Sequence, residues 1–265
     1  MSVLLSIVVW VRGVTQLADV VFIIHRSSSI CRFSATTHQR LADIDAEGVG
    51  DPGDIVACEQ MSQLYVADRS EQCVWRVSPD GDDIERWLPK SPSDTYRPST
   101  LSVTSSRLLV TPFSVQQLIH LDAGGDELRR VPLPDYMHPH HAVESPSGTF
   151  IVSHSNTQLK QQQVSEVNTE GQVLRQFSGS SLGQPLHIPA DSRGNIIVAD
   201  TFYCRILLLD AKLALRRVIV DEHLLNYQKP WRVCYVEQSG QLLVEFDVIS
   251  FHDKKRVAVF DLLRR

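Results

Sequence analysis

Residues 185–200 read P-L-H-I-P-A-D-S-R-G-N-I-I-V-A-D, and this stretch decides the fold. A proline opens an apolar-rich segment, a turn follows at Arg193-Gly194, and a dense apolar run occupies residues 196–199. Glycine favours turns, and short continuous apolar runs are typical of strands that are buried on both faces. The stretch therefore predicts two consecutive strands of a sheet that is covered on both sides.

The same order recurs along the chain with a period of 41 to 46 residues. Five prolines open similar segments, and they are Pro52, Pro98, Pro139, Pro185 and Pro230. A sixth, weaker start lacks the proline and lies at residues 12–14. Self-similarity at this spacing is typical of the blades of a β-propeller, in which each unit supplies four strands.

Each unit continues with a third apolar strand, as at residues 206–209, and a more polar fourth strand, as at residues 215–220. Outer strands have one wet face, so the gradient fits a propeller. We predict an all-β, six-bladed β-propeller of four-stranded antiparallel blades in a single domain, 1–265. The blades run roughly over 11–50, 51–95, 96–137, 138–183, 184–228 and 229–265. Residues 3–10 are expected to supply the missing strand of the last blade and close the ring.

Composition argues against several classes of protein. The net charge of −5 and pI of about 6.0 disfavour binding to nucleic acid or to anionic membranes through overall charge. The apolar start of the chain is too short for a membrane span. The five cysteines are widely spaced and form no C-x-x-C pair. We therefore expect buried thiols in a reducing compartment and a cytoplasmic location.

Two strand sequences, L-Y-V-A-D at residues 64–68 and I-I-V-A-D at 196–200, resemble the core strand of NHL repeats. The third strand at residues 205–209, R-I-L-L-L, and the proline-led starts are similar to that family as well. Thr111 and His154 are read as standing where Asp68 and Asp200 do, which is a departure from the pattern. The resemblance implies a binding platform for proteins or, in some members, RNA, similar to the propeller of tripartite-motif NHL proteins.

The propeller arrangement also predicts a candidate binding face. Blade-entry loops and the loops between second and third strands lie on one face of such a fold, so the second residue after each opening proline should border the channel mouth. Gly13 and five polar residues hold this position: Asp54, Thr100, His141, His187 and Arg232. Loops on the same face add Asp68, Arg69, His154, Asn156, Asp200 and Tyr203. We expect a recognition surface. The alternative is that these side chains cap turns and tie blades together.

Histidines raise a second hypothesis, a metal-dependent lyase or hydrolase. His138, His140 and His141 cluster at one blade entry, and His187 holds the matching position in the next blade. Three histidines with water form a catalytic zinc site. The six-bladed peptide-amidating lyases look similar in repeat, but their three-histidine pattern is not reproduced in register here. We expect no cofactor; if a metal binds, its ligands are His140, His141 and His187.

RNA binding is a third hypothesis. It would need clustered basic residues with exposed aromatic rings. The pairs Arg129-Arg130 and Arg216-Arg217 fall instead on the outer strands of different blades, where charge protects an edge. Our leading interpretation is a non-enzymatic, monomeric scaffold that binds a protein partner through the loops around the channel, without contacting a membrane.

Overall fold

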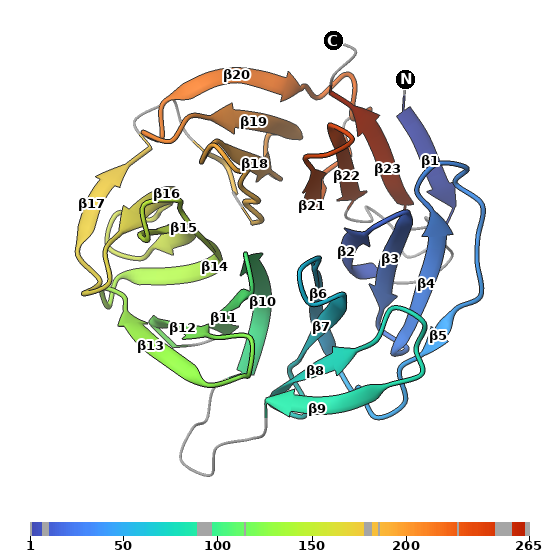
Figure 1. The fold of residues 1–265 in the computed structure, drawn as a ribbon. Coiled ribbons are helices and arrows are strands. Elements are labelled where there is room, and N and C mark those ends of the chain that lie inside the picture. Colours follow the sequence, from blue (N-terminus) through green and yellow to red (C-terminus); the bar gives the residue numbers. More distant parts are fainter. Residues whose placement is uncertain are drawn as a thin grey trace. The chain divides into compact units, whose positions relative to one another are not determined.

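Six antiparallel sheets form from the predicted repeats, and the fold is an all-β, six-bladed β-propeller (Figure 1). The computed structural model describes residues 2–6, 11–88, 97–113, 115–177, 182–184, 186–226, 228–246 and 256–262. In those ranges no helix is long and apolar enough to cross a membrane. The strands divide between two compact units, residues 9–130 and residues 1–8 with 131–265.

Residues 9–130 contain the first three blades, each a meander of four neighbouring strands. The first blade comprises β2 (Val11–Leu17), β3 (Val20–His25), β4 (Ser29–Ser34) and β5 (Ile44–Asp45). The second comprises β6 (Pro52–Cys58), β7 (Gln63–Asp68), β8 (Cys73–Val77) and β9 (Ile84–Leu88). The third comprises β10 (Arg97–Thr104), β11 (Arg107–Phe113), β12 (Gln117–Leu121) and β13 (Glu127–Pro132), the last strand running just past the unit boundary.

The other unit contains the remaining three blades. The fourth comprises β14 (Met137–Glu144), β15 (Phe150–Asn156), β16 (Gln161–Val167) and β17 (Val173–Gln176). The fifth has β18 (Ile196–Asp200), β19 (Arg205–Leu209) and β20 (Leu215–Val220). The sixth has β21 (Pro230–Val236), β22 (Gln241–Phe246), β23 (Arg256–Asp261) and β1 (Ser2–Ser6).

The N-terminal strand completes the sixth blade, as predicted (Figure 1). β1 pairs antiparallel with β23 from Ser2 opposite Phe260 to Ser6 opposite Arg256. The pairing covers an edge of β23 that would otherwise present unpaired backbone groups. Residues 7–10 of the predicted strand lie outside the described residues.

The fifth blade departs from the prediction of a regular first strand after Pro185, a residue that lies outside the described ones. Residues 186–190 run beside β18 without forming a continuous ladder. Ala199 N–H donates to His187 O (3.1 Å) and Ile197 N–H donates to Pro189 O (2.9 Å). Proline has no N–H to return, which interrupts the ladder. The segment still holds the place of an innermost strand.

Apolar side chains of adjacent sheets pack into shared cores within each unit. In one unit Phe22 and Ile24 of the first blade pack with Leu64 and Val66 of the second. In the other unit, Val164 of the fourth blade packs in one cluster with Ile196 and Val198 of the fifth-blade strand β18. The blades are therefore sandwiched between neighbours, which is why their second strands read as continuous apolar runs.

Candidate functional site

A one-residue β-bulge marks the same place in five first strands. The register shifts fall between Val11 and Gly13, Pro52 and Asp54, Pro98 and Thr100, Pro139 and His141, and Pro230 and Arg232. The residue after each bulge is the one predicted to border the channel mouth, so these positions are equivalent within their sheets. Bulges re-aim side chains and are common beside functional sites.

The register also corrects one assignment. Asp68 pairs with Pro52, and His154 pairs with Pro139, so these two residues are equivalent. Thr111 instead pairs with Thr100, the residue after the bulge. The position of Asp68 in the third blade is therefore Pro112, and the expectation for Thr111 was wrong by one residue, because the alignment rested on apolar runs of unequal length.

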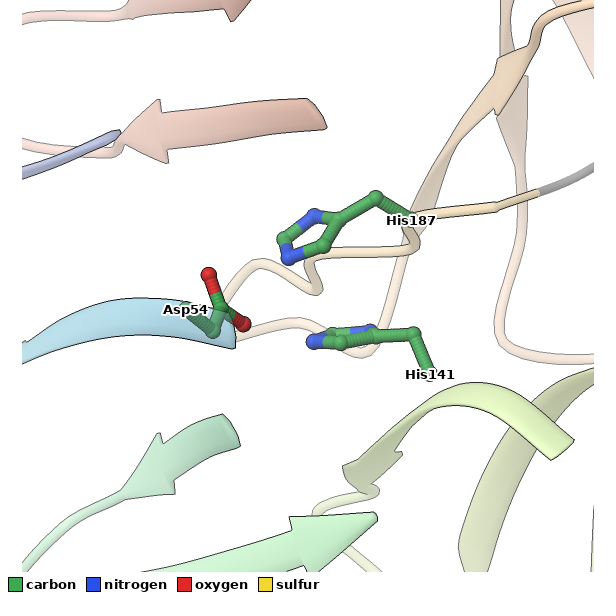
Figure 2. A group of neighbouring side chains, drawn as sticks. All are labelled: Asp54, His141 and His187. Carbon is green, nitrogen blue, oxygen red and sulfur yellow. The ribbon is translucent and has the colours of Figure 1, made fainter. Parts of the chain in front are cut away.

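His141 and His187 are brought together inside their unit, as Figure 2 shows. Their ring centroids are 3.9 Å apart with an interplanar angle of 32°, and a ring nitrogen of each lies within 4.8 Å of the other. Nδ1 of His141 accepts a hydrogen bond from the Ile188 N–H (3.3 Å). His141 is 1% exposed, and His187 is half-buried on the irregular segment of the fifth blade.

His140, the third candidate metal ligand, does not join this pair. It is the extra residue of the bulge, and its Nε2 lies 2.9 Å from Ser155 Oγ and 3.3 Å from Gln162 Oε1. Burial lowers the pKa of His140, so the ring is neutral at physiological pH. Its side chain belongs to a polar cluster of the fourth blade.

Asp54, also drawn in Figure 2, belongs to the other unit and is described with it. The side chain is 2% exposed. Its carboxylate accepts hydrogen bonds from the N–H groups of Ile55 and Leu101, both at 3.0 Å. Asp54 thereby links the first strands of the second and third blades, where Thr100 is buried at the equivalent position.

Arg232 is the remaining charged residue of the register set. It is buried opposite Glu245 on β22, and Arg232 Nε lies 3.9 Å from Glu245 Oε2. A buried guanidinium requires such a counter-charge. The positive charge of Arg232 is therefore balanced by the negative charge of Glu245 within the sixth blade.

Asp68 explains the chemistry of the V-A-D strand ending. Its carboxylate accepts hydrogen bonds from the N–H groups of Gly50 (2.7 Å), Asp51 (3.2 Å), Ser70 (3.0 Å) and Glu71 (3.1 Å), and from Trp75 Nε1 (3.1 Å). Burial raises the pKa of Asp68, but the hydrogen bonds outweigh burial and the pKa is lowered. The ionised carboxylate therefore fastens the segment entering the blade to the end of its second strand.

Asp200 has the same function in the fifth blade. It accepts hydrogen bonds from the N–H groups of Gly183 (3.0 Å) and Gln184 (3.1 Å), and an ion pair joins it to Arg205 Nε at 3.0 Å. Asp200 is fully buried. These contacts match the alternative that the aspartates tie parts of a blade together.

Two further candidates are buried in the fourth blade. His154 has no exposed surface, its Nε2 lies 2.8 Å from Ser165 Oγ, and burial lowers its pKa to about 4. Asn156 Oδ1 accepts hydrogen bonds from the N–H groups of Gln158 (3.1 Å) and Leu159 (3.0 Å), capping the following turn.

Arg69 belongs to the unit of residues 9–130. It is half-buried, and it donates to Ser99 Oγ of the same unit at 3.1 Å.

The accessible part of the predicted face is the loop between β18 and β19. Phe202 is 64% exposed and Tyr203 is 41% exposed, and their rings meet edge to face with centroids 5.1 Å apart. The Arg205 guanidinium carbon lies 4.8 Å from the Tyr203 ring centroid, within range of a cation–π contact. Tyr203 was predicted. Phe202 was missed, although adjacent aromatic residues in a turn after a buried strand were a signal for it.

No protein-family model and no curated protein matches the sequence. Solved structures match across most of the chain. A candidate gluconolactonase has a TM-score of 0.74 at 12% identity, covering 97% of this chain and 91% of its own. A chain of the nidogen/laminin complex has a TM-score of 0.65 at 14% identity, covering 81% of each chain. Hydrazine synthase of Kuenenia stuttgartiensis has a TM-score of 0.62 at 12% identity, covering 89% and 92%.

At such identities these likenesses show the fold alone. They place the chain among β-propellers, while membership of the NHL family stays a prediction. Two of the three proteins carry enzyme names and one comes from a protein complex. The fold by itself is therefore compatible with catalysis and with binding.

Proposed function

We propose that the chain is a protein-interaction module that acts by binding, with the Phe202–Tyr203 loop as its anchor. The observation that carries this proposal is the exposure of two adjacent aromatic rings on a face where most other candidate residues are buried. Tyr and Arg are enriched among the residues that dominate binding energy at protein interfaces. An exposed Phe in contact with a Tyr adds apolar area that water does not solvate well.

The loop is held in place before any partner arrives. Thr201 Oγ1 donates to Pro230 O (2.6 Å), and Asp200 holds both Gly183 and Arg205. A Cβ at Gly183 would lie 2.4 Å from Phe202 Cβ, so only glycine lets the two segments pass this closely. A preordered loop loses little conformational entropy on binding, which favours affinity.

Two further observations support this function over its rivals. A propeller of this fold occurs in the nidogen/laminin complex, a protein–protein assembly. The Arg129-Arg130 and Arg216-Arg217 pairs lie on β13 and β20, the outer strands of their blades, and not beside the aromatic loop in sequence. The five free cysteines support a reducing, cytoplasmic location for the module.

The test compares partners captured by three forms of the purified chain. The matched control is Leu128→Ala with Leu174→Ala, which removes two exposed apolar side chains from the outer strands β13 and β17. We expect a saturable protein partner to bind the wild type and this control, and to bind Phe202→Ala/Tyr203→Ala at least about tenfold more weakly. Equal binding by all three forms contradicts the anchor. Loss of binding after nuclease treatment would indicate RNA instead.

A further inference from the structure

We propose that His141 and His187 form a binding site for a divalent transition-metal ion of the zinc type. The two imidazoles come from consecutive blades of one unit, and each belongs to the innermost segment of its blade. Their ring nitrogens lie within 4.8 Å of one another (Figure 2). Small side-chain rotations would bring two such nitrogens to the spacing that a shared metal ion requires.

The backbone of both histidines is fixed by neighbours that are not themselves candidate ligands. The N–H of His141 donates to Ser153 Oγ, and Ser153 Oγ is also within 3.2 Å of His141 O. On the other side, His187 O accepts the Ala199 N–H at 3.1 Å. Ligands whose main chain is already immobilised lose little entropy when a metal ion binds.

The chemistry of the pair selects the class of ion. Neutral imidazole suits zinc, copper, nickel and iron, whereas magnesium and calcium prefer oxygen ligands. The two rings already lie close together, with centroids 3.9 Å apart, so both imidazoles can reach the same ion. Two protein nitrogens leave two positions of a tetrahedral ion for water or another ligand.

The contact from Ile188 gives the site a spectroscopic signature. Because the Ile188 N–H donates to Nδ1 of His141, a neutral ring in this state carries its proton on Nε2. Coordination through Nε2 moves the proton to Nδ1 and ends the Ile188 hydrogen bond. Metal binding should therefore change the Ile188 amide resonance, whereas adventitious binding to exposed histidines should not.

The experiment titrates zinc chloride into the EDTA-treated, dialysed full chain by isothermal calorimetry at pH 7.5. We expect one equivalent to bind, with at least about tenfold weaker affinity in His187→Gln and in His141→Gln. The matched control is His138→Ala with His223→Ala, which removes two exposed histidines and should leave the affinity unchanged. His187→Gln is the informative variant if His141→Gln fails to fold, because His187 is only half-buried.

A second measurement follows the Ile188 amide in a nitrogen–proton correlation spectrum during the same titration. A shift that saturates at one equivalent and disappears in His187→Gln supports the site. Zinc affinity that is equal in the wild type and in folded His187→Gln overturns it, as does a zinc-saturated spectrum in which the Ile188 amide is unchanged.

Discussion

Replacing Asp68 with alanine removes the acceptor that fastens the entry of the second blade to its second strand. This carboxylate accepts six hydrogen bonds. Four come from main-chain N–H groups, one from the Trp75 indole and one from the Ser70 hydroxyl at 2.8 Å. Asp68 has no exposed surface, so water reaches these donors only if the surrounding segment moves. The donors of Gly50 and Asp51 would be left without their partner.

The magnitude follows from the number of donors left behind. A buried donor that loses its acceptor costs about 1 to 3 kcal/mol, and the segment can relax enough to hydrate some of them. We therefore expect Asp68→Ala to lower the free energy of unfolding by about 3 to 5 kcal/mol, at the upper end for single substitutions. Because the pKa of Asp68 is lowered in the fold, the stabilisation is present above about pH 4 and is lost as the pH falls further.

Urea unfolding at pH 7, followed by far-ultraviolet circular dichroism, measures the effect without relying on Trp75 fluorescence. The matched control is Asp80→Ala, which removes an exposed aspartate that also caps a turn, through the Asp82 N–H at 3.1 Å. The control should change stability little, since water can replace that acceptor. An Asp68→Ala variant no less stable than the control would refute the reasoning.

Three other predictions concern stability. Burial lowers the pKa of His154 to about 4, so between about pH 6.5 and pH 4 the unfolded chain binds a proton that the folded chain does not bind. From pH 7.5 to pH 5, the free energy of unfolding of the wild type should therefore fall by about 2 kcal/mol more than that of His154→Gln, as measured by urea unfolding. Parallel pH profiles would contradict this. Deleting residues 2–6 should cost about 3 to 5 kcal/mol, at about 1 kcal/mol for each lost hydrogen bond, and promote association through β23; an unchanged thermal midpoint and a monomeric elution would argue against closure by β1. Gly171→Ala should cost at least about 2 kcal/mol, because φ is +81° and a Cβ would lie 1.9 Å from Pro132 O, whereas Gly148→Ala, with φ of +77° and open space, should cost about 1 kcal/mol; equal costs by differential scanning calorimetry would contradict the steric account.

Much of the fold was predictable because one blade cannot bury its apolar strands without neighbouring blades, so the same apolar pattern recurs in every unit. The proline-led period located the first strands, and the residue two positions after each proline proved to follow a bulge in every described first strand that has the proline. The closure by β1 was predictable because the last unit supplied only three strands. The irregular segment at residues 186–190 escaped prediction, although Pro189 lacks the N–H that a regular ladder needs.

The candidate site was less predictable, because side-chain burial depends on contacts between strands far apart in sequence. In the sequence, Asp200 lies where a strand meets a loop, which suggests an accessible side chain. In the structure, its carboxylate accepts hydrogen bonds from the N–H groups of Gly183 and Gln184. His140 and His141 are adjacent, and only the bulge decides which of them approaches His187.

Site-specific photocrosslinking tests the central claim, that the Phe202–Tyr203 loop docks a protein partner. A benzophenone-bearing amino acid placed at position 202 is irradiated in cells, with the same group at position 174 on the outer strand β17 as control. We predict a discrete protein adduct at position 202 that is absent at position 174. No adduct at position 202, or the same adducts at both positions, would contradict the account.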